Sequence, residues 1–321
     1  MSYTALNAAV CSDFDKLAGL CHLWRMASPL THDVVTLRTG EARADIAMLG
    51  AEVVRWAIDG QELLWRPEPE VWPRVSPILF PIVGRANGGH IQVDGKAYPI
   101  GIHGFAADSV FSVEEQTADR VRFRLEDSAA SRAIYPFPFT LAVDYALGLN
   151  GLSLQIAVAN TGQAPMPYAC GAHPGFRWPL GAADRAHASI VFEQDEEPSV
   201  PVITSEGLFA TGRRAVPLRG RTLALNDGLF AREALCWLDA NSRRVAYHDG
   251  AGQVLRIAAR DFRHWALWTR PPASFLCIEA WTGHGDPHGF CGELSQKPSM
   301  IVLAPGERRA HGLEISLSES I

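Results

Sequence analysis

The chain has 321 residues, of which 47% are hydrophobic and 20% charged, so it holds enough apolar material for a sizeable core. The formal net charge of −6 argues against a nucleic-acid-binding protein, and no apolar run is long enough to span a membrane. Six cysteines without a C-x-x-C pair favour reduced thiols in a cytoplasmic protein over a disulfide-stapled secreted one.

The first 30 residues do not share the pattern that begins near Val34. They contain Asp13, Asp15 and Lys16, and they lack the basic region and clean apolar run of a secretory signal. We therefore expect residues 1–30 to be a poorly ordered N-terminal extension. The remainder, residues 31–321, is expected to form a single catalytic domain.

From Val34 onward, short runs of alternating apolar and polar residues are separated by Gly, Pro, Asn and Asp, as in half-buried antiparallel strands. Three turn dipeptides lie between such runs and predict hairpins: Asp59-Gly60, Asp94-Gly95 and Asn150-Gly151. The predicted strands cover residues 34–37, 44–48, 53–58, 121–125, 141–147 and 152–159.

Helical periodicity is scarce along the whole chain. One short helical turn is expected at residues 229–235, after a capped start at Asp227-Gly228. The 21 prolines also oppose a helix bundle, and no repeat or linker divides the chain. The sequence thus predicts an all-β protein, a large antiparallel sandwich with few short helices, and leaves the strand order open.

A glycine-rich segment, residues 80–111, carries Arg85 and His103. Glycine beside the histidine lets a ligand approach the backbone closely, and Phe105 can anchor the loop in the core. Taken alone, His103 fits a histidine satisfied in a turn equally well, and Arg85 fits a surface ion pair.

The next candidate is His173, which lies between Gly171-Ala172 and Pro174-Gly175 at the mouth of a predicted strand. Such a rigid loop can hold an imidazole in one orientation, as a proton donor requires. In isolation a β-turn histidine with no chemical role is an equally good interpretation.

Glu279 is the most informative single residue, because it lies inside the apolar run of residues 275–281. A carboxylate there is costly unless it is paired or catalytic, and a buried structural ion pair is the alternative interpretation. Alternation places Cys277 and Trp281 on the same face as Glu279. An indole beside a carboxylate also suits the apolar face of a sugar ring, so Trp281 is a candidate substrate contact.

Taken in order, these segments resemble the galactose mutarotase superfamily, and within it the bacterial aldose 1-epimerase branch often called LacX-like. The resemblance spans about residues 34–317 and rests on four motifs: Gly-Arg at 84–85, His-Gly-Phe-Ala at 103–106, His-Pro-Gly-Phe at 173–176 and Cys-Ile-Glu-x-Trp at 277–281. Each motif is weak alone, and their order on an all-β background makes the set specific.

The resemblance implies a β-supersandwich fold and interconversion of the α- and β-anomers of a free aldose. It assigns the general base to Glu279, the general acid to His173 and the contact near the ring oxygen to His103. Arg85 matches an arginine that contacts sugar hydroxyls, and Asp227 matches a substrate-binding aspartate.

One carboxylate and one imidazole suffice for this chemistry, because anomer exchange only moves protons on and off the C1 hydroxyl and the ring oxygen. No cofactor and no metal are therefore expected. The expected partner is a small monosaccharide, with no nucleic acid and no membrane, and the protein is expected to be a monomer or homodimer.

Two departures and two alternatives accompany the resemblance. Relatives often carry arginine where this chain has Ala107, and residues 86–90 lack a second arginine found in classical mutarotases. One alternative is a hexose-6-phosphate 1-epimerase, for which Arg85, Arg177 and Arg213-Arg214 offer cationic groups. The other is a non-catalytic carbohydrate-binding protein on the same fold.

Two further classes of site receive little support. His284 and His288 are four residues apart, but Gly285, Asp286 and Pro287 oppose the helix that a zinc-binding pair at this spacing needs. A Ser–His–Asp hydrolase would need a G-x-S-x-G elbow and a βαβ framework, and the sequence predicts neither.

Overall fold

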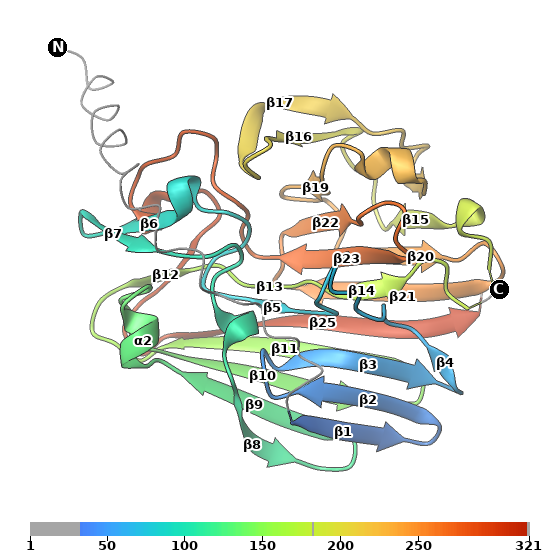
Figure 1. Cartoon of the computed structure of the whole chain (residues 1–321), viewed down its shortest axis with the longest axis horizontal. Coiled ribbons are helices and arrows are strands. Elements are labelled where there is room, and N and C mark those ends of the chain that lie inside the picture. Colours follow the sequence, from blue (N-terminus) through green and yellow to red (C-terminus); the bar gives the residue numbers. More distant parts are fainter. Residues whose placement is uncertain (1–32, 182, 320–321) are drawn as a thin grey trace.

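The computed structural model describes residues 33–181 and 183–319, and the predicted extension of residues 1–30 lies outside them. Strands dominate the described chain, and the predicted all-β class is confirmed (Figure 1).

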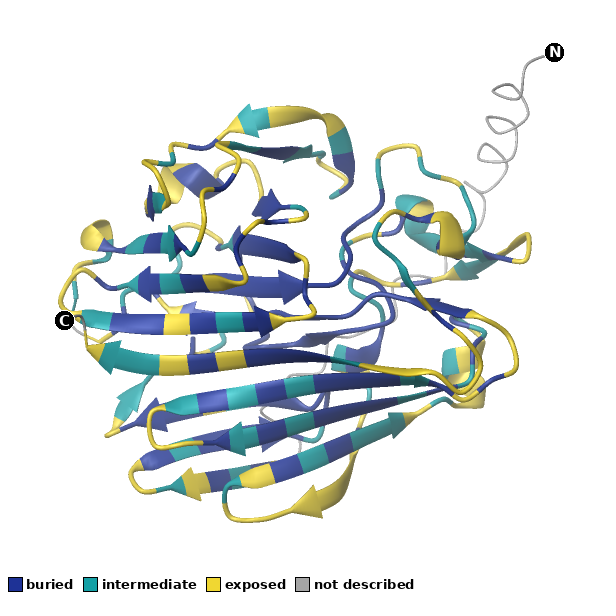
Figure 2. Ribbon diagram, turned by 180° about the vertical axis from the view of Figure 1, so that it is seen from behind, coloured by how far each residue is buried: buried dark blue, intermediate teal, exposed yellow. Residues whose placement is uncertain are grey.

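The largest sheet has nine strands, in the order β18-β15-β20-β21-β25-β11-β10-β9-β8. It forms one broad layer, whose strands alternate buried and more exposed residues when seen from behind (Figure 2). Its strands are β8 (Ser112–Gln116), β9 (Arg120–Glu126), β10 (Phe139–Leu147), β11 (Gly151–Asn160), β15 (Ser189–Phe192), β18 (Thr222–Ala224), β20 (Arg244–His248), β21 (Gln253–Arg260) and β25 (Arg308–Glu319).

Two smaller sheets lie in front of this layer in Figure 1. The four-stranded sheet comprises β1 (Val34–Thr39), β2 (Ala42–Ala47), β3 (Glu52–Ile58) and β4 (Gln61–Glu62). The six-stranded sheet runs in the order β19-β22-β23-β13-β5, and β14 also pairs with β23. Its strands are β5 (Ile78–Leu79), β13 (Gly171–Ala172), β14 (Gly175–Arg177), β19 (Leu235–Trp237), β22 (His264–Trp268) and β23 (Phe275–Trp281).

Three two-stranded sheets and a few short helical turns complete the described fold. The pairs are β6 (His90–Val93) with β7 (Lys96–Pro99), β12 (Met166–Tyr168) with β24 (Ile301–Leu303), and β16 (Ser199–Ile203) with β17 (Phe209–Ala215). The helical turns are η3 (Asn87–Gly89), η4 (Ala106–Asp108), α2 (Ala129–Arg132), η5 (Arg185–His187), η6 (Asp227–Phe230) and η7 (Leu294–Gln296). Within the described ranges, no helix has the length and apolar character that a membrane crossing requires.

The six predicted strands correspond to β1, β2, β3, β9, β10 and β11, and the three predicted hairpins join β3 to β4, β6 to β7 and β10 to β11. The prediction for residues 229–235 was wrong in its bounds. The turn η6 starts at Asp227 and ends at Phe230, and Leu235 already begins β19. The turn is therefore a single short 3-10 helix, and the chain joins the six-stranded sheet soon after it.

The main core lies between the nine-stranded layer and the two front sheets. From β23 it takes Leu276, Ile278 and Ala280, so the alternate residues of that strand face the other way. Cys170, Cys236 and Cys277 are buried free thiols, as expected, but the expectation was wrong for Cys291, which is exposed and disulfide-bonded.

Candidate active site

Glu279 lies in the middle of β23, on the face that points away from the main core. Strand alternation puts Cys277 and Trp281 on that same face, and Glu279 itself is only 1% exposed. The carboxylate has thus left bulk water for a largely apolar environment. Such a position costs free energy unless neighbouring groups compensate it.

His173 reaches Glu279 because two short strands on either side of it pair with the same neighbour. In β13, Gly171 and Ala172 pair with Trp281 and Ala280 of β23, and in β14 Gly175 pairs with Cys277. The intervening residues 173 and 174 therefore lie beside Glu279. The backbone N–H of His173 donates to the carbonyl of Pro77 (3.1 Å), which fixes the loop.

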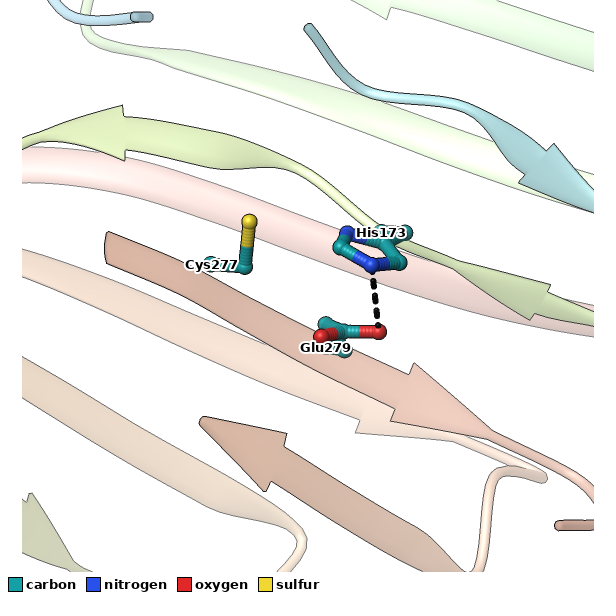
Figure 3. A group of neighbouring side chains, drawn as sticks. All are labelled: His173, Cys277 and Glu279. Carbon is teal, nitrogen blue, oxygen red and sulfur yellow. Dashed lines mark ion pairs between the residues drawn. The ribbon is translucent and has the colours of Figure 1, made fainter. Parts of the chain in front are cut away.

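The two side chains meet directly, with 3.2 Å between His173 Nε2 and Glu279 Oε2 (Figure 3). Burial raises the pKa of Glu279 well above its ordinary range, and burial together with the nearby His103 lowers the pKa of His173. Both shifts disfavour charge, so they favour one proton held between the two groups. Such a pair can take a proton at one atom while it gives one from another.

Trp281 holds the carboxylate. Its indole N–H donates to Glu279 Oε2 (3.0 Å), and this hydrogen bond lowers the pKa of Glu279 against the larger effect of burial. The indole is 5% exposed and packs closely on Gly171, where a Cβ would come within 2.7 Å of Cδ1. The polar contact that the structure gives the Trp281 side chain is therefore with Glu279.

His103 lies beside His173, with ring centroids 5.6 Å apart. Its Nδ1 accepts a hydrogen bond from the backbone N–H of Gly84 (3.1 Å), so in the neutral ring the proton is on Nε2. Burial, with the nearby cations Arg85 and Lys297, lowers the pKa of His103 to about 4. At neutral pH this ring is therefore an uncharged donor through Nε2.

The backbone around His103 is tightly constrained. His103 has a φ of 62° and Gly104 a φ of 79°. A Cβ on Gly104 would lie 2.2 Å from the carbonyl oxygen of Phe80, so only glycine fits there. The conformation presses the His-Gly turn against the strand that precedes Arg85.

Two tryptophans that the sequence analysis did not select enclose His173. The ring centroid of Trp72 is 5.2 Å from that of His173, and the ring of Trp268 lies edge-on at 5.8 Å. Trp268 pairs with Cys277 across β22 and β23, so it shares the face of Glu279. The position of Trp268 on an apolar strand was the one sequence feature that could have indicated a site residue, and a core residue explains that feature equally well.

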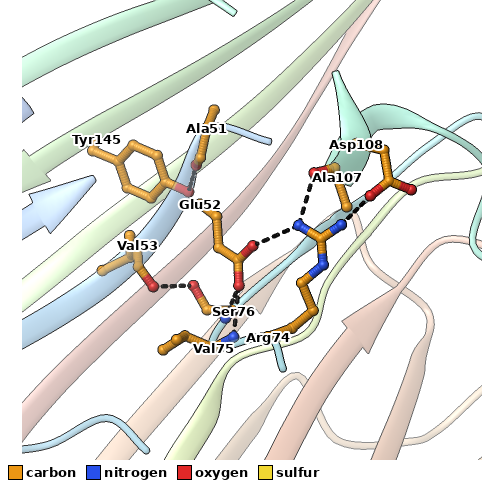
Figure 4. Close-up of polar contacts among 9 residues, drawn as sticks. All are labelled: Ala51, Glu52, Val53, Arg74, Val75, Ser76, Ala107, Asp108 and Tyr145. Atoms are coloured by element: carbon orange, nitrogen blue, oxygen red, sulfur yellow. Dashed lines mark hydrogen bonds and ion pairs between the residues drawn. The ribbon is translucent and has the colours of Figure 1, made fainter. Parts of the chain in front are cut away.

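A buried polar network is centred on Glu52 and Arg74 (Figure 4). Glu52 is fully buried and accepts hydrogen bonds from the backbone N–H groups of Val75 (2.6 Å) and Ser76 (2.9 Å). Arg74 pairs with Glu52 (3.3 Å), donates to the carbonyl of Ala107 (2.9 Å) and contacts the Asp108 carboxylate. Arg74 thus joins the loop before β5 to the turn that follows His103.

Ala107 therefore has a visible structural role through its backbone. Its carbonyl is one of the acceptors of Arg74, and Gly50 approaches it so closely that a Cβ there would lie 2.8 Å from the same oxygen. Glu52 and Arg74 could not be selected from the sequence, because nothing in their spacing predicts that β3 and the loop before β5 meet.

Arg85 is exposed at the rim, next to His103. Its backbone carbonyl accepts a hydrogen bond from the N–H of Asp286 (2.8 Å), and its aliphatic chain packs under Gly207, where a Cβ would be 2.7 Å from Cδ. Asp286 is itself buried and paired with Lys297 (2.8 Å). The backbone of residues 84–87 is thus fixed by contacts with Asp286, while the Arg85 side chain stays exposed.

Asp227 does not join this group in the described structure. It is exposed at the start of η6, and its carboxylate forms an ion pair with Arg185, whose guanidinium stacks on Trp178. Of the cations weighed for a phosphate, Arg214 donates to the backbone carbonyls of Leu229, Glu233 and Ala234.

The region around His284 and His288 is a loop, as expected, and not a helix. His284 is buried with its Nδ1 2.8 Å from the carbonyl oxygen of Gly285, and His288 is exposed. The group with metal-ligand geometry in the described chain is instead His173, Cys277 and Glu279, whose donor atoms lie within 4.8 Å of one another.

The chain is similar in sequence and structure to sugar epimerases. A sequence model described as aldose 1-epimerase matches residues 33–316. The chromosomal protein LacX of Lactococcus lactis subsp. lactis is 29% identical over 270 residues, which cover 81% of this chain and 90% of LacX.

Two solved structures share the fold closely. A galactose mutarotase related enzyme from Lactobacillus acidophilus superposes with a TM-score of 0.82 at 28% identity, covering 89% of this chain and 97% of that one. A galactose mutarotase-like protein from Lactobacillus casei ATCC 334 gives a TM-score of 0.83 at 26% identity, covering 89% and 100%.

Proposed function

The chain belongs to the aldose 1-epimerase family, and on that basis we propose that it interconverts the α- and β-anomers of a free aldose. The observation that carries the proposal is the buried contact of 3.2 Å between His173 Nε2 and Glu279 Oε2. The contact supports the proposal because a neighbouring carboxylate and imidazole can together exchange protons with the two oxygens bonded to the anomeric carbon of a sugar.

In the proposed reaction, Glu279 removes the proton of the C1 hydroxyl while His173 protonates the ring oxygen. The bond between C1 and the ring oxygen breaks, and C1 becomes an aldehyde carbon. Rotation about the C1–C2 bond presents the opposite carbonyl face. Ring closure then returns the proton from the ring hydroxyl to His173 and the proton from Glu279 to the new C1 hydroxyl, which restores the pair.

The neighbouring groups have supporting roles in this proposal. His103 donates from Nε2 to a sugar oxygen near the ring oxygen, and its low pKa keeps it neutral. Arg85, exposed next to His103, contacts sugar hydroxyls, whereas Asp227 is paired with Arg185 and receives no role in this proposal. Trp281 orients Glu279 through its indole N–H and borders the sugar ring.

The proposal is tested by following optical rotation after freshly dissolved α-glucose or α-galactose is added to the purified protein. We expect the approach to equilibrium to be faster than in buffer, in proportion to protein concentration. A panel of free aldoses and their 6-phosphates identifies the substrate class. Acceleration only with 6-phosphates would favour a hexose-6-phosphate 1-epimerase, and rates equal to buffer throughout would reject epimerase activity.

A further inference from the structure

Cys277 is a buried thiol beside the proposed acid–base pair, and the anomerisation chemistry gives it no task. We propose that His173, Cys277 and Glu279 form a site for one thiophilic divalent cation, of the class of Zn²⁺, and that the cation inhibits the enzyme. The binding follows from the three donors themselves, and the inhibition rests on the proposed function.

The backbone already arranges the donors as a strand-based zinc site requires. Cys277 and Glu279 are two residues apart on β23, so both side chains point to one face. His173 comes from the neighbouring segment between β13 and β14. Figure 3 shows the thiol and the carboxylate on the same strand and the imidazole on the neighbouring segment. One nitrogen, one sulfur and one oxygen donor leave the fourth tetrahedral position for water.

The distances require only small side-chain movements. With ordinary Zn–N and Zn–O bond lengths, a tetrahedral ion holds its nitrogen and oxygen ligands about 3.3 Å apart. His173 Nε2 and Glu279 Oε2 are 3.2 Å apart, and all three donor atoms lie within 4.8 Å. Among the described residues His173 Nδ1 has no hydrogen-bond partner, so adjustment of the imidazole breaks no hydrogen bond at that atom.

Charge balance favours the ion in this buried position. Binding releases two protons to solvent, the thiol proton of Cys277 and the proton shared by His173 and Glu279, and leaves a thiolate, a carboxylate and a neutral imidazole around the divalent cation. The two negative ligands neutralise the ion, so the buried complex carries no net charge. Trp72, Phe275 and Trp268 form an aromatic wall around the cluster and limit access of water to it.

Such a complex prevents catalysis by occupying both proton-transfer groups. The lone pair of His173 and the carboxylate of Glu279 are then bound to the cation, and neither can exchange a proton with the sugar. A cation bound at His284 instead would leave this pair free. Inhibition that depends on Cys277 therefore distinguishes the proposed site from other sites.

Binding is tested directly with Co²⁺, without any sugar, so the result does not depend on enzymatic activity. Titration of the full-length protein is expected to give a thiolate-to-cobalt charge-transfer band that saturates at one equivalent and is displaced by Zn²⁺. Cys277→Ala should lose the band, and Cys170→Ala, which removes another buried free thiol, should keep it. An absent band, or a band kept by Cys277→Ala, would overturn the site.

Inhibition is then measured by polarimetry with Zn²⁺ buffered at known free concentrations. We expect wild type to lose activity, a chelator to restore it, and Cys277→Ala to need about 100-fold more Zn²⁺, since even outer-shell changes weaken metal sites about 10- to 100-fold. Cys277→Ser serves as a second variant if Cys277→Ala does not fold. Equal sensitivity of wild type and a folded Cys277 variant would contradict inhibition through this site. A cobalt band in a protein that does not anomerise sugars would reject the proposed function and retain the site.

Discussion

The chemistry of the site depends on the proton shared by His173 and Glu279 and on the hydrogen bond that Trp281 donates to Glu279. Glu279 Oε2 contacts both His173 Nε2 and the indole N–H of Trp281, and all three residues are buried. Burial alone would keep the carboxyl group protonated, and the Trp281 hydrogen bond opposes this. The balance between these two effects sets how readily Glu279 accepts a proton.

Replacing Trp281 by phenylalanine should therefore impair catalysis without removing the aromatic ring. Without the indole N–H, the pKa of Glu279 rises further, and the pH–activity profile should move to higher pH. A hydrogen bond to a charged group contributes about 1.5–3 kcal/mol, so we expect kcat to fall about 10- to 100-fold. The control is Trp237→Phe, which removes an indole donor to the carbonyl of Glu197 on the opposite face of the sheet. Equal losses in both variants would contradict the assignment.

His103 should make the folded protein sensitive to acid. In the unfolded chain it takes up a proton near pH 6.5, whereas in the folded protein it does so only near pH 4. Between these values the unfolded state binds more protons, so the free energy of unfolding should fall as the pH decreases from 6.5 to about 4.

This dependence is measured by urea unfolding across that pH range. One proton contributes at most about 1.4 kcal/mol per pH unit, and His103→Asn should show a shallower slope than wild type by up to that amount. Identical slopes in the two proteins would show that His103 titrates normally in the folded state.

Among these residues, only Glu279 could be selected on physical grounds from the sequence. A carboxylate inside an apolar strand is conspicuous, whereas a histidine in a Gly- and Pro-rich loop is not. His173 and His103 gained significance through the ordered motifs, and their approach to within 5.6 Å depends on contacts between distant segments. Trp72 stayed undetected because a tryptophan in an apolar context is normally a core residue.

Among the structural elements, the loop of residues 71–77 links the fold to the site. It carries Trp72 against His173, supplies the Pro77 carbonyl to the His173 backbone, and is itself held by Glu52 and Arg74. Arg74 also binds the turn that follows His103. We infer that this network positions both histidines, although it does not contact the proton-transfer pair.

Arg74→Met should therefore reduce both stability and kcat. It leaves the fully buried Glu52 without its cation, and removing one partner of a buried ion pair costs about 3–5 kcal/mol. The double variant Glu52→Gln/Arg74→Met should recover part of the stability, because no buried charge remains. Urea unfolding and polarimetry on the same samples measure the two effects.

The matched control is the exposed pair of Arg55 and Glu62 on β3 and β4. Arg55→Met makes the same substitution in a solvent-exposed ion pair. We expect the free energy of unfolding to fall by less than about 1 kcal/mol, with no change in kcat. If Arg74→Met behaved like Arg55→Met, the positioning role of the network would be wrong.

Hairpins could be predicted where a short sequence motif marks the turn. Asp94-Gly95 and Asp59-Gly60 mark their turns because aspartate adopts a positive φ there, 52° and 50° respectively. By contrast, β5 and β13 are only two residues long, too short for any periodic pattern. These two strands help to position His173, so the most important local geometry of the site had no sequence signal.

At the scale of the whole molecule, the sandwich places the core residues and the site residues on opposite faces of one sheet. One face of the six-stranded sheet closes the main core with residues such as Leu276 and Ile278, and the other presents Glu279 and Cys277. The rigid core fixes the strand, and the loops above it supply the histidines. All-β class and hairpins follow from the sequence, but the order β21-β25-β11 joins strands far apart in the chain, and no local pattern specifies it.

The central claim is that Glu279, paired with His173, moves the proton in anomer exchange. The direct measurement is the polarimetric rate of Glu279→Gln, which keeps the size of the side chain and removes the base. Near-ultraviolet circular dichroism and the urea midpoint confirm that the variant is folded, and Glu62→Gln is the surface control. We predict a loss of at least about 100-fold in kcat for folded Glu279→Gln and none for Glu62→Gln. A folded Glu279→Gln protein with the wild-type rate would contradict the claim.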